Sequence, residues 1–198
     1  MTEEDRELRS FVEWGGPVWE QQVAIGLKWL GDLAGMRVLD IGTRYGGMAT
    51  YLALHGAHVT GLETVAEPLE QARARALALG VADSVNLLTY SGDPADLPKG
   101  FDIVFTKSTL VVMPDLDLAA QGIAASLIPG GRLLAVENAR GPLPLHIARV
   151  ARHRTLRPHG AAYFTGASIN AIEAHLRVDL IRWTTTPPTV VVGAIKGT

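Results

Sequence analysis

The sequence alternates short apolar segments with longer amphipathic ones, and this alternation limits the possible fold more than any other feature. The apolar segments have the length and composition of buried strands, and most are followed by helical spacing or by a glycine-rich turn. The predicted strands cover residues 37–41, 57–62, 84–90, 101–106, 132–137, 178–183 and 189–195. Strands that alternate with helices favour parallel βαβ units, with helices on both faces of one sheet.

The segments between these strands predict the helices. Thr64 and Glu67 have the spacing of a capping box, with Pro68 just inside the helix that follows. A Gly-Gly-Pro break at residues 15–17 separates a short first helix from a longer second one. The longer predicted helices cover residues 18–33, 47–55, 68–79, 117–127, 143–156 and 167–176. We therefore expect an α/β fold of one domain, preceded by an N-terminal helical lid.

The composition bounds the class of protein. A chain of 198 residues with 47% apolar and 19% charged residues fits one globular domain. The formal net charge of −2 gives no general attraction to nucleic acid or to anionic lipid. The chain has no cysteine, which excludes disulfides and thiolate chemistry, and we expect no metal site. Its polar N-terminus does not resemble a signal peptide, and no apolar run could span a bilayer. We expect a cytoplasmic protein without nucleic-acid or membrane partners, and a homodimer stays open.

A glycine-rich loop follows the first predicted strand. It reads Asp40-Ile41-Gly42-Thr43-Arg44-Tyr45-Gly46-Gly47. In open α/β sheets, ligands bind beyond the carboxyl ends of the strands, at the point where the strand order switches. Glycines let the backbone approach such a ligand closely, and the next helix points its free N–H groups at it. This loop is therefore the predicted ligand site.

Acidic residues end or follow three successive predicted strands. Glu63 ends the second strand, at a distance from the glycine loop that suits hydrogen bonds from both hydroxyls of an adenosine ribose. Asp93 follows the third strand, where a carboxylate can accept from the exocyclic amine of adenine. Together with Asp40, these acids suit a nucleoside that carries no phosphate but carries a positive sulfonium.

Four segments in register resemble the class I S-adenosylmethionine-dependent methyltransferases, and most closely the small-molecule group typified by quinone-biosynthesis enzymes. The segments are VLDIGTRYGG, VTGLE, GDPADLPKGFDIVF and LIPGGRLLAVE, and together they span about residues 36–137. The resemblance implies a Rossmann-like, seven-stranded, mostly parallel sheet with helices on both faces. It also implies an enzyme that transfers a methyl group from S-adenosylmethionine to a small molecule and releases S-adenosylhomocysteine. The single domain 1–198 would divide into a lid 1–35, a cofactor-binding core 36–137, a substrate wall 138–166 and a C-terminal part 167–198.

The resemblance also implies roles for individual cofactor-binding residues. The methionine end would be held by Asp40, Gly42, Thr43, Arg44 and Gly46, and the ribose by Glu63 with Thr64. Gly92 and Asp93 would recognise adenine, and Thr106 and Lys107 would lie near the transferred methyl. Arg44 departs from the family pattern, which has a glycine there. Its guanidinium could pair with the methionine carboxylate, and the alternatives are an obstructing side chain or one turned to solvent.

The acceptor side is predicted in the basic stretch 138–166. His146, Arg149 and His153 share one face of the predicted helix, which favours an anionic acceptor, with His146 as general base for a hydroxyl. Lys107 is the second catalytic candidate. Trp14, Trp19 and Tyr163 could stack on a planar substrate. For each of these residues the alternative is structural: a solvated helix face, or aromatic rings packed against the sheet.

Three other functions compete with this interpretation. A protein of the same fold could bind the cofactor without transferring the methyl group. An NAD-dependent oxidoreductase would need the middle glycine of G-x-G-x-x-G, where Arg44 stands, and Asp40 would repel a pyrophosphate. A nucleic-acid amine methyltransferase would carry an Asn/Asp-Pro-Pro-aromatic segment after the fourth strand. Residues 106–109 read Thr-Lys-Ser-Thr instead.

Overall fold

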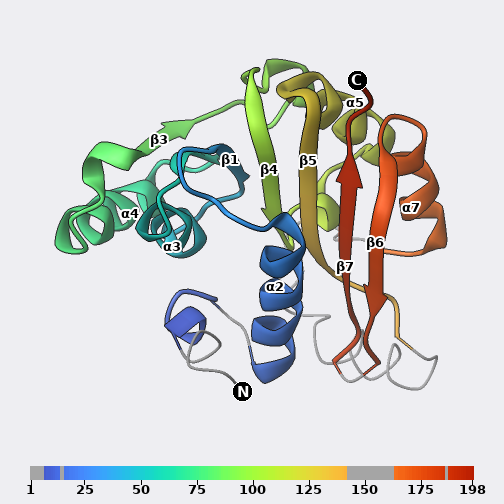
Figure 1. Cartoon of the computed structure of the whole chain (residues 1–198), viewed down its shortest axis with the longest axis horizontal. Helices are drawn as coiled ribbons and strands as arrows, with labels where there is room; N and C mark the ends of the chain where they lie inside the picture. Colours follow the sequence, from blue (N-terminus) through green and yellow to red (C-terminus); the bar gives the residue numbers. More distant parts are fainter. Residues whose placement is uncertain (1–6, 14–15, 142–162, 186) are drawn as a thin grey trace.

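A seven-stranded sheet forms the centre of the computed structural model, which describes residues 7–13, 16–141, 163–185 and 187–198 (Figure 1). The strand order is β3-β2-β1-β4-β5-β7-β6. β1 to β5 are mutually parallel, whereas β7 lies antiparallel between β5 and β6. The strands are β1 (Arg37–Ile41), β2 (His58–Glu63), β3 (Val85–Thr89), β4 (Phe101–Lys107), β5 (Leu127–Asn138), β6 (Arg177–Trp183) and β7 (Thr189–Ile195). The predicted seven-stranded, mostly parallel sheet is confirmed.

Helices cover both faces of the sheet, as the alternation of strands and helices predicts. Within β1, Val38 packs into the apolar cluster that contains α2 and α3, whereas Leu39 packs into the cluster beneath α5 and α7. Successive side chains of a strand point to opposite faces, so adjacent apolar residues of one strand serve both layers. The helices are α2 (Pro17–Leu30), α3 (Gly47–Leu54), α4 (Glu67–Ala78), α5 (Leu116–Ser126) and α7 (Gly166–Glu173). Among the described residues, no helix is both long and apolar enough to cross a membrane.

The strand order reverses beside β1, which lies between β2 and β4. The chain leaves β1 through the glycine loop into α3, and it leaves β4 through the short 3-10 helix η3 (Leu110–Val112) into α5. Since α3 and α5 belong to opposite layers, the two connections diverge at the carboxyl ends of neighbouring strands. This divergence produces the crevice in which open α/β sheets bind their ligands.

Two local predictions are wrong. Helix α4 begins at Glu67 with Ala66 as its N-cap, not at a capping box, and the Thr64 N–H, which would donate to Glu67 in such a box, donates to the Glu63 carboxylate instead (2.8 Å). Strand β5 begins at Leu127 and includes the Pro-Gly-Gly segment that the sequence indicated as a turn before it. Its pairing with β4 is irregular between Phe101 and Ile103, which accommodates those residues. The helix predicted at residues 143–156 lies outside the described residues.

Candidate cofactor site at the carboxyl edge of the sheet

The glycine loop is fixed to the end of β2 by its own backbone. Gly42 and Thr43 both donate their N–H groups to the carbonyl of Leu62, at 2.8 and 3.0 Å. Gly42 and Gly46 have φ angles of 80° and 71°, which L-residues rarely adopt. A β-carbon at Gly42 would collide with the side chain of Thr109. The loop therefore needs glycine at these positions both for its turn and for its close packing.

Arg44 stands where the family pattern has a glycine, and its left-handed backbone conformation explains why a glycine suits that position. Its φ of 46° lies in the left-handed region, which costs an L-residue roughly 1–2 kcal/mol. The Arg44 N–H donates to Oε2 of Glu63 (3.1 Å), and its guanidinium carbon lies 5.3 Å from the centre of the Tyr45 ring. The expected pairing of this guanidinium with a methionine carboxylate stays a prediction.

Two of the predicted acids are oriented by neighbouring backbone groups. Oε1 of Glu63 accepts from the N–H of Thr64 at 2.8 Å. Oδ1 of Asp93 accepts from the N–H of Ala95 at 2.9 Å, so Asp93 is the N-cap of the 3-10 helix η2 (Pro94–Asp96). Gly92, just before it, has a φ of 89°. A carboxylate offers about four acceptor positions, so Asp93 keeps capacity for a ligand amine. On Glu63, ribose hydroxyls would replace the longer bonds from the Thr64 hydroxyl (3.2 Å) and the Val65 N–H (3.4 Å).

Asp40 is the buried member of the three acids. Asp40 is only 3% exposed, and its Oδ2 has no hydrogen-bond partner among the described residues. Burial raises the pKa of Asp40 to about 7, and the nearby carboxylates of Glu13 and Glu63 add to the rise. Thr43 and Lys107 favour the charged form but offset only part of it. A cationic ligand bound beside the glycine loop would stabilise the charged form of this buried carboxylate.

The N-terminal segment 8–13 crosses this edge of the sheet. The Arg75 guanidinium of α4 binds the carboxylate of Glu13 at 2.6 Å, and Nζ of Lys107 donates to the carbonyl of Glu13, also at 2.6 Å. The Phe11 carbonyl packs against Gly47, at the start of α3. The segment predicted as a lid is therefore tied both to α4 and to the end of β4, beside the glycine loop.

Lys107 and Trp19 both contribute to this attachment. Burial lowers the pKa of Lys107, and its ammonium lies 5.0 Å from the centre of the Trp19 ring. Trp19 is 9% exposed and packs in the core with α2 and α3, which favours the structural alternative for this residue. In this structure Lys107 holds the N-terminal segment, and its expected place near the transferred methyl stays a prediction.

Glu137, at the end of β5, is a site residue that the sequence interpretation missed. It is fully buried, and it accepts hydrogen bonds from the Thr106 hydroxyl and from backbone N–H groups of the loop after β4. Burial raises its pKa to about 7 despite these bonds. Thr106 is itself fully buried, and its hydroxyl donates to Glu137; its expected place near the transferred methyl stays a prediction. One sequence feature could have indicated Glu137: it is an acid at the end of an otherwise apolar predicted strand.

The acceptor side is described only in part. Trp14, His146, Arg149 and His153 lie outside the described residues. Tyr163 is half-buried. The residue after it, Phe164, donates its N–H to the carbonyl of Asn138 at 2.9 Å. Tyr163 therefore lies near the carboxyl end of β5, at the same edge as the predicted cofactor residues.

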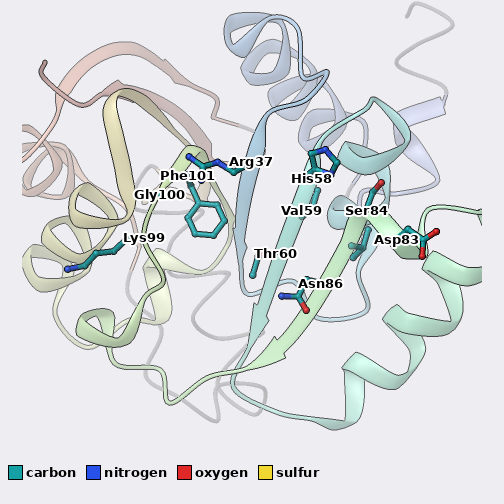
Figure 2. Close-up of a pocket in the computed structure, with 11 residues that line it drawn as sticks. Arg37, His58, Val59, Thr60, Asp83, Ser84, Asn86, Lys99, Gly100 and Phe101 are labelled. Carbon is teal, nitrogen blue, oxygen red and sulfur yellow. The ribbon is translucent and has the colours of Figure 1, made fainter.

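A hollow of about 400 Å³ opens at the opposite edge of the sheet (Figure 2). Arg37, His58 and Phe101 come to it from the amino ends of β1, β2 and β4. Arg37 is already paired with Asp102, whose carboxylate lies 3.7 Å from the guanidinium. Because parallel strands place all their carboxyl ends at the other edge, this hollow is separate from the site of Asp40, Glu63 and Asp93.

Curated relatives with similar sequences are ubiquinone biosynthesis O-methyltransferases. The protein from Aeromonas salmonicida is 34% identical over 122 residues, which cover 60% of this chain and 51% of the relative. The protein from Stutzerimonas stutzeri is 30% identical over 135 residues, 67% of this chain and 58% of the relative. The chain thus spans about half the length of the curated relatives it matches.

Solved structures share the whole fold. An S-adenosylmethionine-dependent methyltransferase from Mesorhizobium loti superposes with a TM-score of 0.74 at 17% identity, covering 92% of this chain and 99% of that one. Magnesium protoporphyrin IX methyltransferase from Synechocystis, solved with bound S-adenosylhomocysteine, gives 0.69 at 20% identity, covering 98% and 94%. A model of the methyltransferase domain family matches residues 32–172, which include the glycine loop and all three acids. The chain belongs to the methyltransferase domain family.

Proposed function

We propose that this chain transfers the methyl group of S-adenosylmethionine to a small molecule. The observation that carries the proposal is the meeting of Asp40, Glu63 and Asp93 at the carboxyl edge of three adjacent strands, around a loop with left-handed glycines. The family membership and the names of the relatives support it. Each of the three acids would contact a different part of the ligand: the methionine end, the ribose or the adenine. A ligand with phosphates would instead be repelled by these carboxylates.

The residues present fit this cofactor. Asp40 carries a buried oxygen that has no partner within the part of the chain that the structure describes, as a site for the methionine end requires. Glu63 would accept from the ribose hydroxyls, with its orientation set by the N–H groups of Arg44 and Thr64. Asp93 would accept from the adenine amine. When bound, S-adenosylmethionine supplies a methyl group activated by its sulfonium.

The chain itself contributes alignment and exclusion of water. Holding the acceptor atom in line with the methyl accounts for most of what such a transfer needs. The N-terminal segment, held by Arg75 and Lys107, would cover the methionine end from solvent. Within the described residues we assign no general base, because the amine of Lys107 is engaged by the Glu13 carbonyl. His146 remains the proposed base if the acceptor is a hydroxyl.

An anionic acceptor remains part of the proposal. It rests on the stretch 138–166, which contains five arginines and three histidines. Arg149 and His153 would meet the acceptor's charge, and Trp14 and Tyr163 would contact its body. The cytoplasmic location and a homodimer likewise remain predictions.

A labelled-methyl assay tests the proposed function. The chain would be incubated with methyl-labelled S-adenosylmethionine and a panel of small aromatic carboxylic acids, with and without a phenolic hydroxyl, and their uncharged amides would be the control. We expect label to appear in the acids and only weakly in the uncharged amides. Binding of the cofactor without transfer to any small molecule would favour the cofactor-binding alternative, and absence of binding would reject both.

A further inference from the structure

The loop after β4 is held by one carboxylate. Oε1 of Glu137 accepts from the N–H groups of Thr109 and Leu110, both at 3.2 Å, and Oε2 accepts from the N–H of Val111 at 3.4 Å. These N–H groups lie at the start of η3, where no intrahelical acceptor is available to them. Ser108, at the head of the loop, has a φ of 56°, a strained value that persists only when its surroundings fix it.

Thr109 connects this loop to the glycine loop. Its hydroxyl donates to the carbonyl of Ile41 at 2.9 Å, and its side chain fills the space that a β-carbon on Gly42 would need. Ile41 ends β1, and Gly42 opens the loop beside Asp40. A displacement of Thr109 would therefore move the backbone at the place where the methionine end is proposed to bind.

We propose that Glu137 is a positioning residue for cofactor binding, which acts through Thr109 on the Ile41–Gly42 backbone. This inference rests on the proposed function. A carboxylate suits the task because its two oxygens can accept from three backbone N–H groups and the Thr106 hydroxyl together. A glutamine would keep one accepting oxygen but would turn an amide N–H₂ toward one of these donors.

Two variants and their combination test the proposal by calorimetric titration with S-adenosylhomocysteine. Glu137→Gln and Thr109→Val should each raise the dissociation constant about tenfold, the size expected for one lost hydrogen bond. The double variant should bind about as weakly as either single variant, because both act on one connection. Ser126→Ala is the matched control: Ser126 is fully buried at the far end of α5, and its hydroxyl donates to the Gly122 carbonyl at 3.0 Å.

Hydrogen exchange separates positioning from simple stabilisation. In Glu137→Gln, the amides of Thr109, Leu110 and Val111 should exchange faster than in the wild type, whereas Ser126→Ala should leave them unchanged. Loss of stability with unchanged affinity in folded Glu137→Gln would overturn the proposal. If that variant does not fold, Thr109→Val decides alone, and wild-type affinity there would contradict us. A wild-type chain that binds no S-adenosylhomocysteine would instead overturn the proposed function.

Discussion

Replacing Glu63 by alanine should weaken the binding of S-adenosylhomocysteine about 100-fold. A hydrogen bond to a charged acceptor contributes roughly 1.5–3 kcal/mol, and Glu63 is placed to accept from both ribose hydroxyls. Each 1.4 kcal/mol is tenfold in affinity, so losing about 3 kcal/mol gives the expected factor. The substitution also removes the acceptor of the Arg44 and Thr64 N–H groups, which would loosen the glycine loop.

Titration calorimetry of the wild type and Glu63→Ala measures this difference. Glu70→Ala is the control, since Glu70 is an exposed carboxylate seven residues further along, on α4. We expect Glu70→Ala to bind like the wild type. Equal affinity in Glu63→Ala would remove the ribose assignment and with it the proposed orientation of the cofactor.

Replacing Asp40 by asparagine should make the stability of the chain depend less on pH. Burial raises the pKa of Asp40 from an ordinary value of 3.8 to about 7. For an acid whose pKa is higher in the folded state, the stabilising contribution is complete below the unfolded pKa and is lost as pH rises through the folded pKa. The wild type therefore loses free energy of unfolding from this group as the pH rises from about 4 through 7, of the order of 4 kcal/mol. The asparagine variant does not.

Urea unfolding at pH 4, 6 and 8 checks this expectation. The difference in free energy of unfolding between Asp40→Asn and the wild type should shift in favour of the variant by about 4 kcal/mol from pH 4 to pH 8. Asp83→Asn makes the same chemical change at an exposed position, and its difference from the wild type should stay nearly constant. Parallel behaviour of the two variants would show that Asp40 is not the buried acid that the structure describes.

The sequence predicted the sheet and the place of the acids because both depend on local pattern. An apolar run of strand length defines each strand, and the residues at its C-terminal end must lie at the carboxyl edge of a parallel sheet. Asp40 and Glu63 follow directly from this logic. The edge that binds the ligand could be predicted without knowing the strand order, because the crevice always lies at the carboxyl ends of the strands, where the order reverses.

The contacts that the sequence could not predict join residues distant in the chain. Glu137 meets Thr109 across 28 positions, and Lys107 meets Glu13 across 94. No periodicity reports such contacts, because only the packed sheet brings these groups together. The capping box at Thr64 failed for a local reason instead: the neighbouring Glu63 carboxylate accepts the Thr64 N–H that Glu67 would have accepted.

A crystal structure with S-adenosylhomocysteine tests the central assignment most directly. It should show adenine at Asp93, the ribose hydroxyls on Glu63 and the amino-acid end beside Asp40 and Gly42. A ligand bound instead in the hollow at the amino ends of the strands, beside Arg37 and Lys99, would contradict the account.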